Sequence, residues 1–386
     1  FTVPAFAYCG SSDVTFYNNK FKNFKVKNDP ITSNAYLFHT NNVNMNVTSN
    51  SFTEITMHHT LIYCNGDAQL FTMVSNIIND CHSFENTNAT IVEVFVQNTD
   101  IRYNSIFFNA ASTKGRAFRI KYHTGCKLIG NHITNALYSQ GCAVYFEQCS
   151  DNSPPLEISD CVFTSCLGDN SAIFYLANLN SKLTITNVTF EKSKNKPVVY
   201  NGYFINIGAI KNHKPCVVFD GCKFSYLESN ANGGGAIGLW LKGSNDNIVN
   251  NLTFYNTQFE HLQFQSANNG NRVAHGGGAL CFDNQVTNKQ VELFVIGCTF
   301  TNVSSFASGG AINFNTPGHT LYVEDCNFSN TFTVNSGQKG GAIYAKVVSN
   351  VMPIIIKGCQ FQNTQSNTGG ALYIERSATS NSDINI

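Results

Sequence analysis

Cysteine is the residue type whose number and spacing in this chain most directly suggest chemistry. Fourteen of the 386 residues are cysteines. No two of them have the Cys-x-x-Cys spacing that is typical of zinc sites, so we expect disulfides or buried thiols here and no bound metal. A subset recurs at one motif position, two residues before a phenylalanine: Cys161, Cys222, Cys298, Cys326 and Cys359.

The shared motif position allows two outcomes for these cysteines. If the repeats stack as strands ~4.8 Å apart, neighbouring Cα atoms fall within the range that a disulfide spans. Cys298–Cys326 or Cys326–Cys359 would then bridge two coils. Alternatively, the thiols stay free and pack as small hydrophobic groups. For cysteines that are close in sequence we favour disulfides: Cys142–Cys149, Cys161–Cys166 and Cys216–Cys222.

Asparagine supplies a second chemical signal, because several asparagines begin an Asn-x-Ser/Thr triplet. Such triplets are acceptors for N-linked glycans in proteins that pass through the secretory route. Together with the cysteine content, they favour an oxidising compartment and an extracellular or cell-surface location. The candidate glycosylation sites are Asn46, Asn88, Asn187, Asn251, Asn302 and Asn327.

Acidic residues and histidines form no catalytic pattern in the sequence. Polysaccharide hydrolysis needs two carboxylates in one groove, and calcium-dependent lyases need clustered acids. Glu324 and Asp325 are neighbours and point to opposite faces of a strand, as do His58 and His59, which we expect at an exposed strand end. We therefore expect no catalytic residue and no cofactor. The remaining acids considered are scattered: Asp220, Glu228, Asp283 and Glu292.

Overall composition narrows the classes of partner. Lysine and arginine number 24, aspartate and glutamate 24, and charged residues make up only 12% of the chain. A basic stripe that could follow a nucleic-acid backbone is lacking, which argues against nucleic-acid binding. The longest apolar runs fall short of the roughly 18 residues that a membrane span needs, so we expect no membrane span.

The elements that must position these residues are repeats. A Gly-Gly-Ala motif, followed by Ile or Leu, alternates with the Phe motif at a period of about 30 residues, which is typical of a solenoid. Each unit is too short for a strand–helix–strand crossover, and the alternation of Leu321 and Val323 indicates strands with one inward face. The glycine pairs begin at Gly234, Gly277, Gly309, Gly340 and Gly369.

Short stacked strands of this kind predict an all-β fold, a parallel β-helix of about a dozen coils. Residues 1–386 would form one elongated domain, with degenerate coils in 1–150 and regular coils in 151–386, the last of them incomplete. In the degenerate part we align Phe24, Phe52, Phe84, Phe107 and Ile133 with the core position, and Cys81 with the cysteine position.

The motifs then acquire structural roles. Phenylalanines at the core position would stack ring on ring inside the helix. The glycine pairs would turn a corner that only glycine allows. Asn302, Asn330 and Asn363, each two residues past a core phenylalanine, would form an amide ladder. The core phenylalanines are Phe163, Phe190, Phe224, Phe259, Phe300, Phe328 and Phe361.

These motifs resemble the repeats of chlamydial polymorphic outer-membrane proteins and of similar β-helical surface proteins in protists. The resemblance covers residues 155–375 well and the first third of the chain poorly. It implies a right-handed parallel β-helix displayed on a cell surface and used for adhesion. Two departures are that the asparagine follows the phenylalanine by two residues rather than three, and that no outer-membrane barrel follows. The resemblance transfers no catalytic residue.

We expect a non-enzymatic, extracellular, N-glycosylated structural protein: a subunit of a surface fibre, filament or coat. The last residues resemble the start of another coil, so the expected partner is a second β-helical segment or another copy, joined head to tail. An adhesin-like rod that binds a glycan or host ligand is the alternative. A polysaccharide lyase or glycoside hydrolase is the third interpretation.

Overall fold

The structure is a computed structural model of the whole chain. It describes residues 5–23, 25–26, 36–57, 59–83, 89–108, 115–123, 125–140, 143–149, 156–177, 182–195, 203–207, 216–229, 235–239, 249–264, 276–283, 290–315, 320–347, 353–376 and 384–386.

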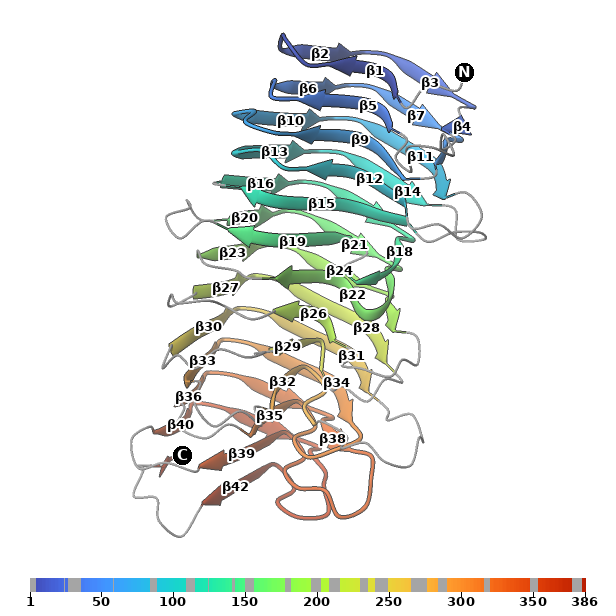
Figure 1. Cartoon of the computed structure of the whole chain (residues 1–386). Coiled ribbons are helices and arrows are strands. Elements are labelled where there is room, and N and C mark those ends of the chain that lie inside the picture. Colours follow the sequence, from blue (N-terminus) through green and yellow to red (C-terminus); the bar gives the residue numbers. More distant parts are fainter. Residues whose placement is uncertain are drawn as a thin grey trace.

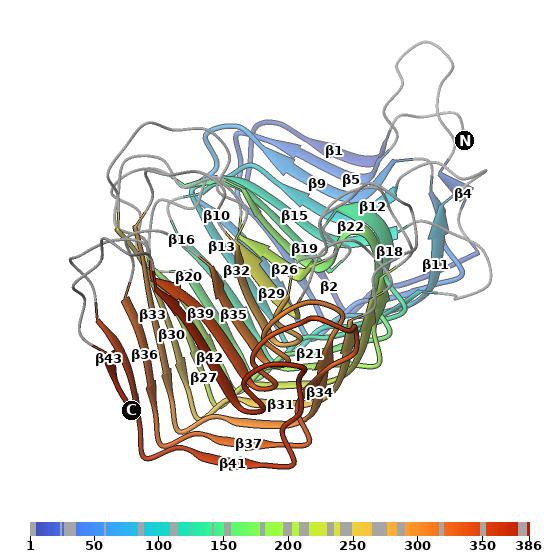
Figure 2. The same cartoon turned by 90° about the horizontal axis from the view of Figure 1, so that it is seen from below.

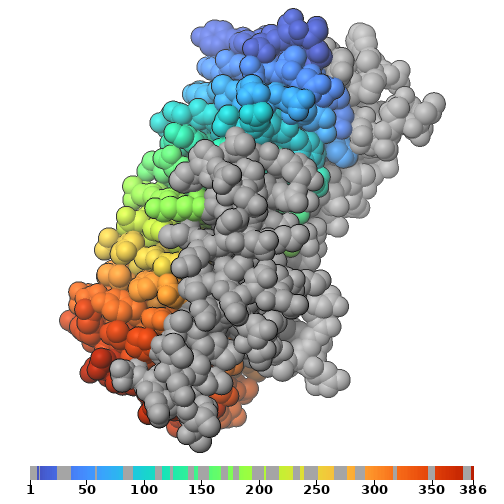
Figure 3. All heavy atoms as spheres, turned by 60° about the vertical axis from the view of Figure 1, so that its left-hand side comes forward, coloured from blue at the N-terminus to red at the C-terminus, as the bar shows by residue number. Residues whose placement is uncertain are grey.

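All described elements are strands, and they wind into a right-handed parallel β-solenoid (Figure 1). Three faces follow one another within each turn, as the end-on view shows (Figure 2). Pairing between turns is parallel, apart from one antiparallel contact between Gly115 and Leu137. Along the long axis of the molecule the sequence advances steadily from N- to C-terminus (Figure 3).

The first face is a sheet of thirteen strands among the described residues. About a dozen coils were expected from the motifs. Its strands are β2 (Val14–Tyr17), β6 (Met45–Thr48), β10 (Leu70–Val74), β13 (Asn98–Arg102), β16 (Gly125–Ile129), β20 (Leu156–Ser159), β23 (Leu183–Thr186), β27 (Cys216–Asp220), β30 (Val249–Tyr255), β33 (Gln290–Ile296), β36 (Thr320–Glu324), β40 (Ile354–Lys357) and β43 (Ile384–Asn385).

The second face carries the Phe motif. Its strands are β3 (Lys20–Lys22), β7 (Ser51–Thr53), β11 (Ile77–Ser83), β14 (Ser105–Phe108), β17 (His132–Thr134), β21 (Val162–Thr164), β24 (Thr189–Glu191), β28 (Lys223–Ser229), β31 (Gln258–Phe264), β34 (Thr299–Ser305), β37 (Asn327–Ser329) and β41 (Gln360–Gln362). Short strands at the following corner are β4 (Lys25–Val26), β8 (Thr56–Met57), β18 (Leu137–Gln140), β25 (Lys194–Asn195) and β38 (Phe332–Thr333).

The third face follows the glycine corner. Its strands are β1 (Ala5–Cys9), β5 (Tyr36–Asn41), β9 (Thr60–Asn65), β12 (Ala89–Val94), β15 (Gly115–His123), β19 (Val144–Cys149), β22 (Leu167–Ala177), β26 (Tyr203–Ile207), β29 (Ile237–Leu239), β32 (Leu280–Asp283), β35 (Ile312–Asn315), β39 (Ile343–Val347) and β42 (Leu372–Arg376).

The predicted phenylalanine column is confirmed. Each ring from Phe163 to Phe361 stacks on the ring of the next coil, with centroids 4.6–5.4 Å apart and planes within 13° of parallel. In-register parallel pairing, such as Phe300 opposite Phe328, places equal residues one above the other. The column is therefore a direct consequence of the repeat.

The expected alignment of the N-terminal coils is partly wrong. Phe52 and Ile133 do occupy the core position, and both are fully buried. In the coils between them, however, that position belongs to Ile78 and Ile106. Phe107 instead points outward and is 41% exposed. Isoleucine can be buried in the core as well as phenylalanine can. A motif that requires phenylalanine therefore selected Phe107 in place of Ile106.

Phe24 and Phe84 lie outside the described residues. The first coil has its core residue at Phe21. Cys81 does not occupy the cysteine position. In its coil that position is held by Asn76, and Cys81 lies five residues further along, opposite Phe108.

The asparagines that follow the core phenylalanines turn the chain at a corner, and they form only part of the predicted amide ladder. Asn302, Asn330 and Asn363 have φ of 53°, 52° and 52°, in the left-handed region that asparagine tolerates better than most residues. One ladder bond exists, from Asn363 Nδ2 to Asn330 Oδ1 at 3.1 Å. Asn302 Nδ2 lies instead 3.4 Å from His261 Nδ1, so the predicted continuous amide ladder is wrong at this position.

The glycine pair turns the corner for two different reasons. The first glycine needs a positive φ, which is 77° at Gly309 and 67° at Gly340. The second has no room for a side chain, because a Cβ at Gly341 would clash with the carbonyl oxygen of Gly370 in the next coil. Sequence reasoning anticipated the first requirement. Close packing between coils supplies the second.

Candidate functional site

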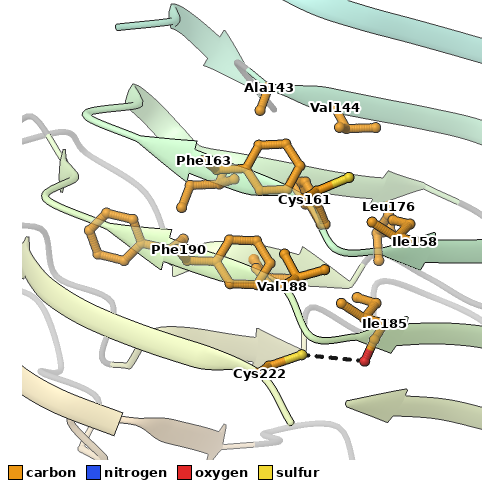
Figure 4. Close-up of a cluster of buried hydrophobic side chains, with 14 of the residues drawn as sticks. Ala143, Val144, Ile158, Cys161, Phe163, Leu176, Ile185, Val188, Phe190 and Cys222 are labelled. Carbon is orange, nitrogen blue, oxygen red and sulfur yellow. Dashed lines mark hydrogen bonds between the residues drawn. The ribbon is translucent and has the colours of Figure 1, made fainter. Parts of the chain in front are cut away.

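The recurring cysteines form a column of free thiols, buried at Cys161, Cys222, Cys298 and Cys326 and partly buried at Cys359. Their Sγ atoms donate to carbonyl oxygens of the preceding coil, as from Cys222 to Ile185 at 3.3 Å (Figure 4) and from Cys326 to Val295 at 3.4 Å. In-register rungs also hold equivalent Cβ atoms about 4.8 Å apart, beyond the ~3.5–4.5 Å of a disulfide. The free-thiol alternative therefore describes Cys298, Cys326 and Cys359.

The favoured local disulfides are not formed where the structure describes the thiols. Cys161 and Cys166 are both free and buried, and Cys161 Sγ donates to the carbonyl oxygen of Leu128 at 3.5 Å. Cys222 is likewise free, which removes the expected pair with Cys216. Cys142 lies outside the described residues, and only the backbone of Cys149 and Cys216 is described. Burial raises the pKa of the Cys161 and Cys222 thiols to about 11.

In the N-terminal coils the cysteine position holds asparagine, which the sequence analysis missed. The backbone and side-chain amides of Asn76 both donate to Asn104 Oδ1, at 2.9 Å each, and Asn104 donates to Asn131 in the same way. The ladder ends where the Asn131 N–H meets Cys161 Sγ at 3.3 Å. An asparagine two residues before each inward apolar residue was the available signal. The members are Asn19, Asn50, Asn76, Asn104 and Asn131.

The described sequon asparagines all lie on the outside of the solenoid. Asn46 and Asn251 are half-buried on the first face, where Thr48 and Thr253 donate to their Oδ1 atoms at 2.6 and 2.9 Å. The other three lie around the second face: Asn187 at the corner before it, Asn327 on it and Asn302 at the corner after it. Asn88 lies outside the described residues.

The densest cluster of ionisable and aromatic side chains lies on the N-terminal half of the third face. We call it the third-face strip. It runs over β5, β9, β12, β15, β19 and β22, which lie side by side in Figure 2. Its members come from segments about 30 residues apart and meet through strand register. They are Tyr36, His39, His59, Thr60, Tyr63, Glu93, Arg116, Arg119, Tyr145 and Tyr175.

Glu93 is the centre of the strip. It is only 4% exposed. Its Oε1 accepts from Arg119 Nη1 at 2.7 Å and its Oε2 accepts from Thr60 Oγ1 at 3.2 Å. Thr60 in turn lies 2.9 Å from His59 Nδ1. His59 is half-buried in this network, so the expectation of an exposed strand end was wrong; His58 lies outside the described residues.

Aromatic rings flank this ion pair on both sides. Tyr36 and Tyr63 stack with ring centroids 4.6 Å apart, and Tyr145 and Tyr175 stack at 5.2 Å with planes 10° apart. The Arg116 guanidinium lies 4.6 Å from the centroid of Tyr145. These contacts occupy ring faces of the four tyrosines.

Burial shifts the proton equilibria in the strip. It lowers the pKa of His39 and of His59, and the Arg119 charge lowers that of His59 further while Glu93 opposes the shift. Burial and the neighbouring Tyr63 and Glu93 raise the pKa of Tyr36. At neutral pH both histidines are therefore uncharged, and Tyr36 and Tyr63 keep their hydroxyl protons.

The chemistry available to this strip is hydrogen bonding. Glu93 is its only described carboxylate, and it is committed to Arg119 and Thr60. Paired-carboxylate hydrolysis needs a second acid across the scissile bond. Within the described ranges, no group of three His, Cys, Asp or Glu side chains is close enough together to hold a metal ion.

The C-terminal end of the solenoid is a second candidate surface. Phe361, Leu372 and Ile374 continue the core but are only partly buried, whereas Phe328 and Ile343 in the preceding coil are fully buried. Val14 and Phe16 are likewise partly buried at the N-terminal end. Each end thus exposes apolar core residues beside strand edges that pair on one side only among the described strands.

No protein-family model, curated protein or solved structure matches this chain. Within the described part, no helical segment has the length and apolar character that crossing a bilayer requires.

Proposed function

We propose that this protein is a non-enzymatic structural subunit of an extracellular fibre or coat, N-glycosylated and joined end to end with other copies. The observation that carries the proposal is the pair of ends. Among the described residues, the outermost strands at both ends pair on one side only, and core residues there are partly buried, such as Phe16 at one end and Phe361 at the other. A rung from a second copy has the shape and chemistry that these core residues already pack against inside the chain.

The extracellular part of the proposal is supported by the sequons. Five of the six lie among the described residues, and all five point outward. The recurring cysteines no longer support it, because Cys161, Cys222, Cys298 and Cys326 are free and buried. The resemblance to surface-protein repeats points the same way. Peptide mass spectrometry of the protein isolated from its source tests this part; unmodified asparagine at all six sequons contradicts it.

A charge placed on the C-terminal end tests the association. In Phe361→Asp the new carboxylate lies on the partly buried end of the core, whereas in Gln360→Asp the same charge lies on the exposed side of the same strand. Burying an unpaired carboxylate in an apolar contact is costly. Sedimentation velocity over a concentration series should show assembly in the parent chain and in Gln360→Asp, and its loss in Phe361→Asp. Equal behaviour of both variants overturns the proposed contact.

A further inference from the structure

We propose that the third-face strip binds an extended, uncharged saccharide chain that lies along the solenoid axis. This binding function goes beyond the structural role. Its residues follow one another in register on five successive coils: Tyr63, Glu93, Arg119, Tyr145 and Tyr175. At the ~4.8 Å rung spacing they cover about 19 Å, which offers one polar group for about every sugar unit of a straight chain.

The side chains of the strip pack closely against one another. Its outward side chains are buried or half-buried: Glu93 and Arg116 are each 4% exposed and Tyr36 is 8% exposed. Outward side chains on the second face stand clear of the surface by comparison, with Ile77 at 56%.

The strip is also free of candidate glycosylation sites. All five described sequon asparagines lie on the first face, on the second face or at the corners beside the second face. This step rests on the proposed glycosylation: attached glycans would cover two faces and leave the third accessible. The composition and geometry of the strip do not depend on it.

Charge and hydrogen bonding favour an uncharged polyhydroxy ligand. Arg116 and Arg119 against Glu93 leave a formal charge of +1 (two minus one) among the strip members, since both histidines are neutral. That is too little to hold a polyanion by charge alone. Tyrosine hydroxyls can both donate and accept, and the Tyr63 hydroxyl already accepts from Asn65 Nδ2 at 3.2 Å.

Removal of the hydroxyl groups alone tests the site. The triple variant Tyr63→Phe, Tyr145→Phe, Tyr175→Phe keeps the stacked rings. The matched control is Tyr103→Phe with Tyr226→Phe, two tyrosines outside the strip that are 60% and 55% exposed. Isothermal titration calorimetry on the full chain measures binding of neutral hexasaccharides of β-1,4-linked glucose, β-1,4-linked N-acetylglucosamine, β-1,3-linked glucose and α-linked mannose. Hexagalacturonate serves as the acidic probe.

We expect at least one neutral hexasaccharide to bind with a Kd below about 1 mM, and the triple variant to weaken it by about tenfold or more while the control does not. The inference is overturned if no neutral probe binds in this range, if only hexagalacturonate binds, or if the triple variant binds as the parent does. Circular dichroism spectra of parent and variants verify that the rings still support the fold. Sedimentation and glycan mapping test the proposed structural function separately. The saccharide-binding inference and the proposed function can therefore fail independently.

Discussion

At the scale of single residues, one repeated position stabilises the corner before the second face in every coil. The residue two before each second-face core residue is asparagine in the first five coils, and mostly cysteine, with one valine and one threonine, in the following seven. Asparagine satisfies buried backbone groups through its own amide, as Asn104 Nδ2 does by donating to the Met73 carbonyl oxygen at 2.9 Å. Cysteine occupies the same space with one weak donor. The two halves of the solenoid therefore stabilise the same corner by different chemistry.

The asparagine ladder predicts a large local energy loss on truncation. Asn104→Ala leaves the buried N–H of Asn76 and the Met73 carbonyl oxygen without their partners. We expect the free energy of unfolding to fall by about 3 kcal/mol. Asn19→Ala, at the exposed first rung of the same ladder, is the matched control and should cost less than about 1 kcal/mol. Urea denaturation measures both; equal losses would contradict the role of burial.

The strip histidines predict a stability that decreases in mild acid. His39 and His59 are held neutral in the fold with pKa values below the ordinary 6.5, so the unfolded chain binds protons more readily. The contribution of the two neutral histidines to stability is therefore fully present above pH 6.5, and it is lost as the pH falls below that value. Burial is the main cause of both pKa shifts. A hydrogen bond with Asn65 opposes the shift of His39, and for His59 the charge of Glu93 opposes the shift while that of Arg119 adds to it.

We expect Tm to fall by about 2–4 °C more between pH 7.5 and 5.5 in the parent chain than in the variant His39→Gln with His59→Gln. His132→Gln, at an exposed position on the second face, is the control. Differential scanning calorimetry at each pH gives the slopes. If the double variant keeps the slope of the parent, the histidines are not its source.

At the scale of the elements, the glycine corner before the third face depends on close contact between glycines of successive coils. In Gly341→Ala the new Cβ would clash with the Gly370 carbonyl oxygen, whereas in Gly337→Ala it would meet nothing within 4 Å. Gly337 has a φ of 82°, so its substitution costs only the backbone strain, about 1–2 kcal/mol. We expect Gly341→Ala to cost more than about 3 kcal/mol by chemical denaturation. Similar costs at the two sites would contradict the role of close packing between coils.

The elements also show what a single sequence can and cannot predict here. Strict repeats in the C-terminal half predicted the strands, the phenylalanine column and the first glycine of each corner. Where Ile106 replaces phenylalanine, the motif selected Phe107 and shifted the inward position by one residue. The third-face strip was not predictable from spacing, because Glu93 and Arg119 meet only once the register of β12 and β15 is known.

At the scale of the whole molecule, the solenoid is a rod whose outermost described strands pair on one side only. Thirteen first-face strands at ~4.8 Å give a length of about 60 Å. Lateral faces and ends would then have separate roles. In the two proposals, the ends join copies, the first two faces carry glycans and the third face binds a ligand. A coat built in this way can bind saccharide without any change in the contacts that hold it together.

Negative-stain electron microscopy of the purified full chain, imaged over a rising concentration series, tests the proposed end-to-end assembly most directly. Head-to-tail stacking predicts unbranched filaments one rod wide, which lengthen with concentration and repeat along their axis at about the rod length of ~60 Å. Single short rods at every concentration, in protein whose circular dichroism shows the intact β-fold, would contradict it.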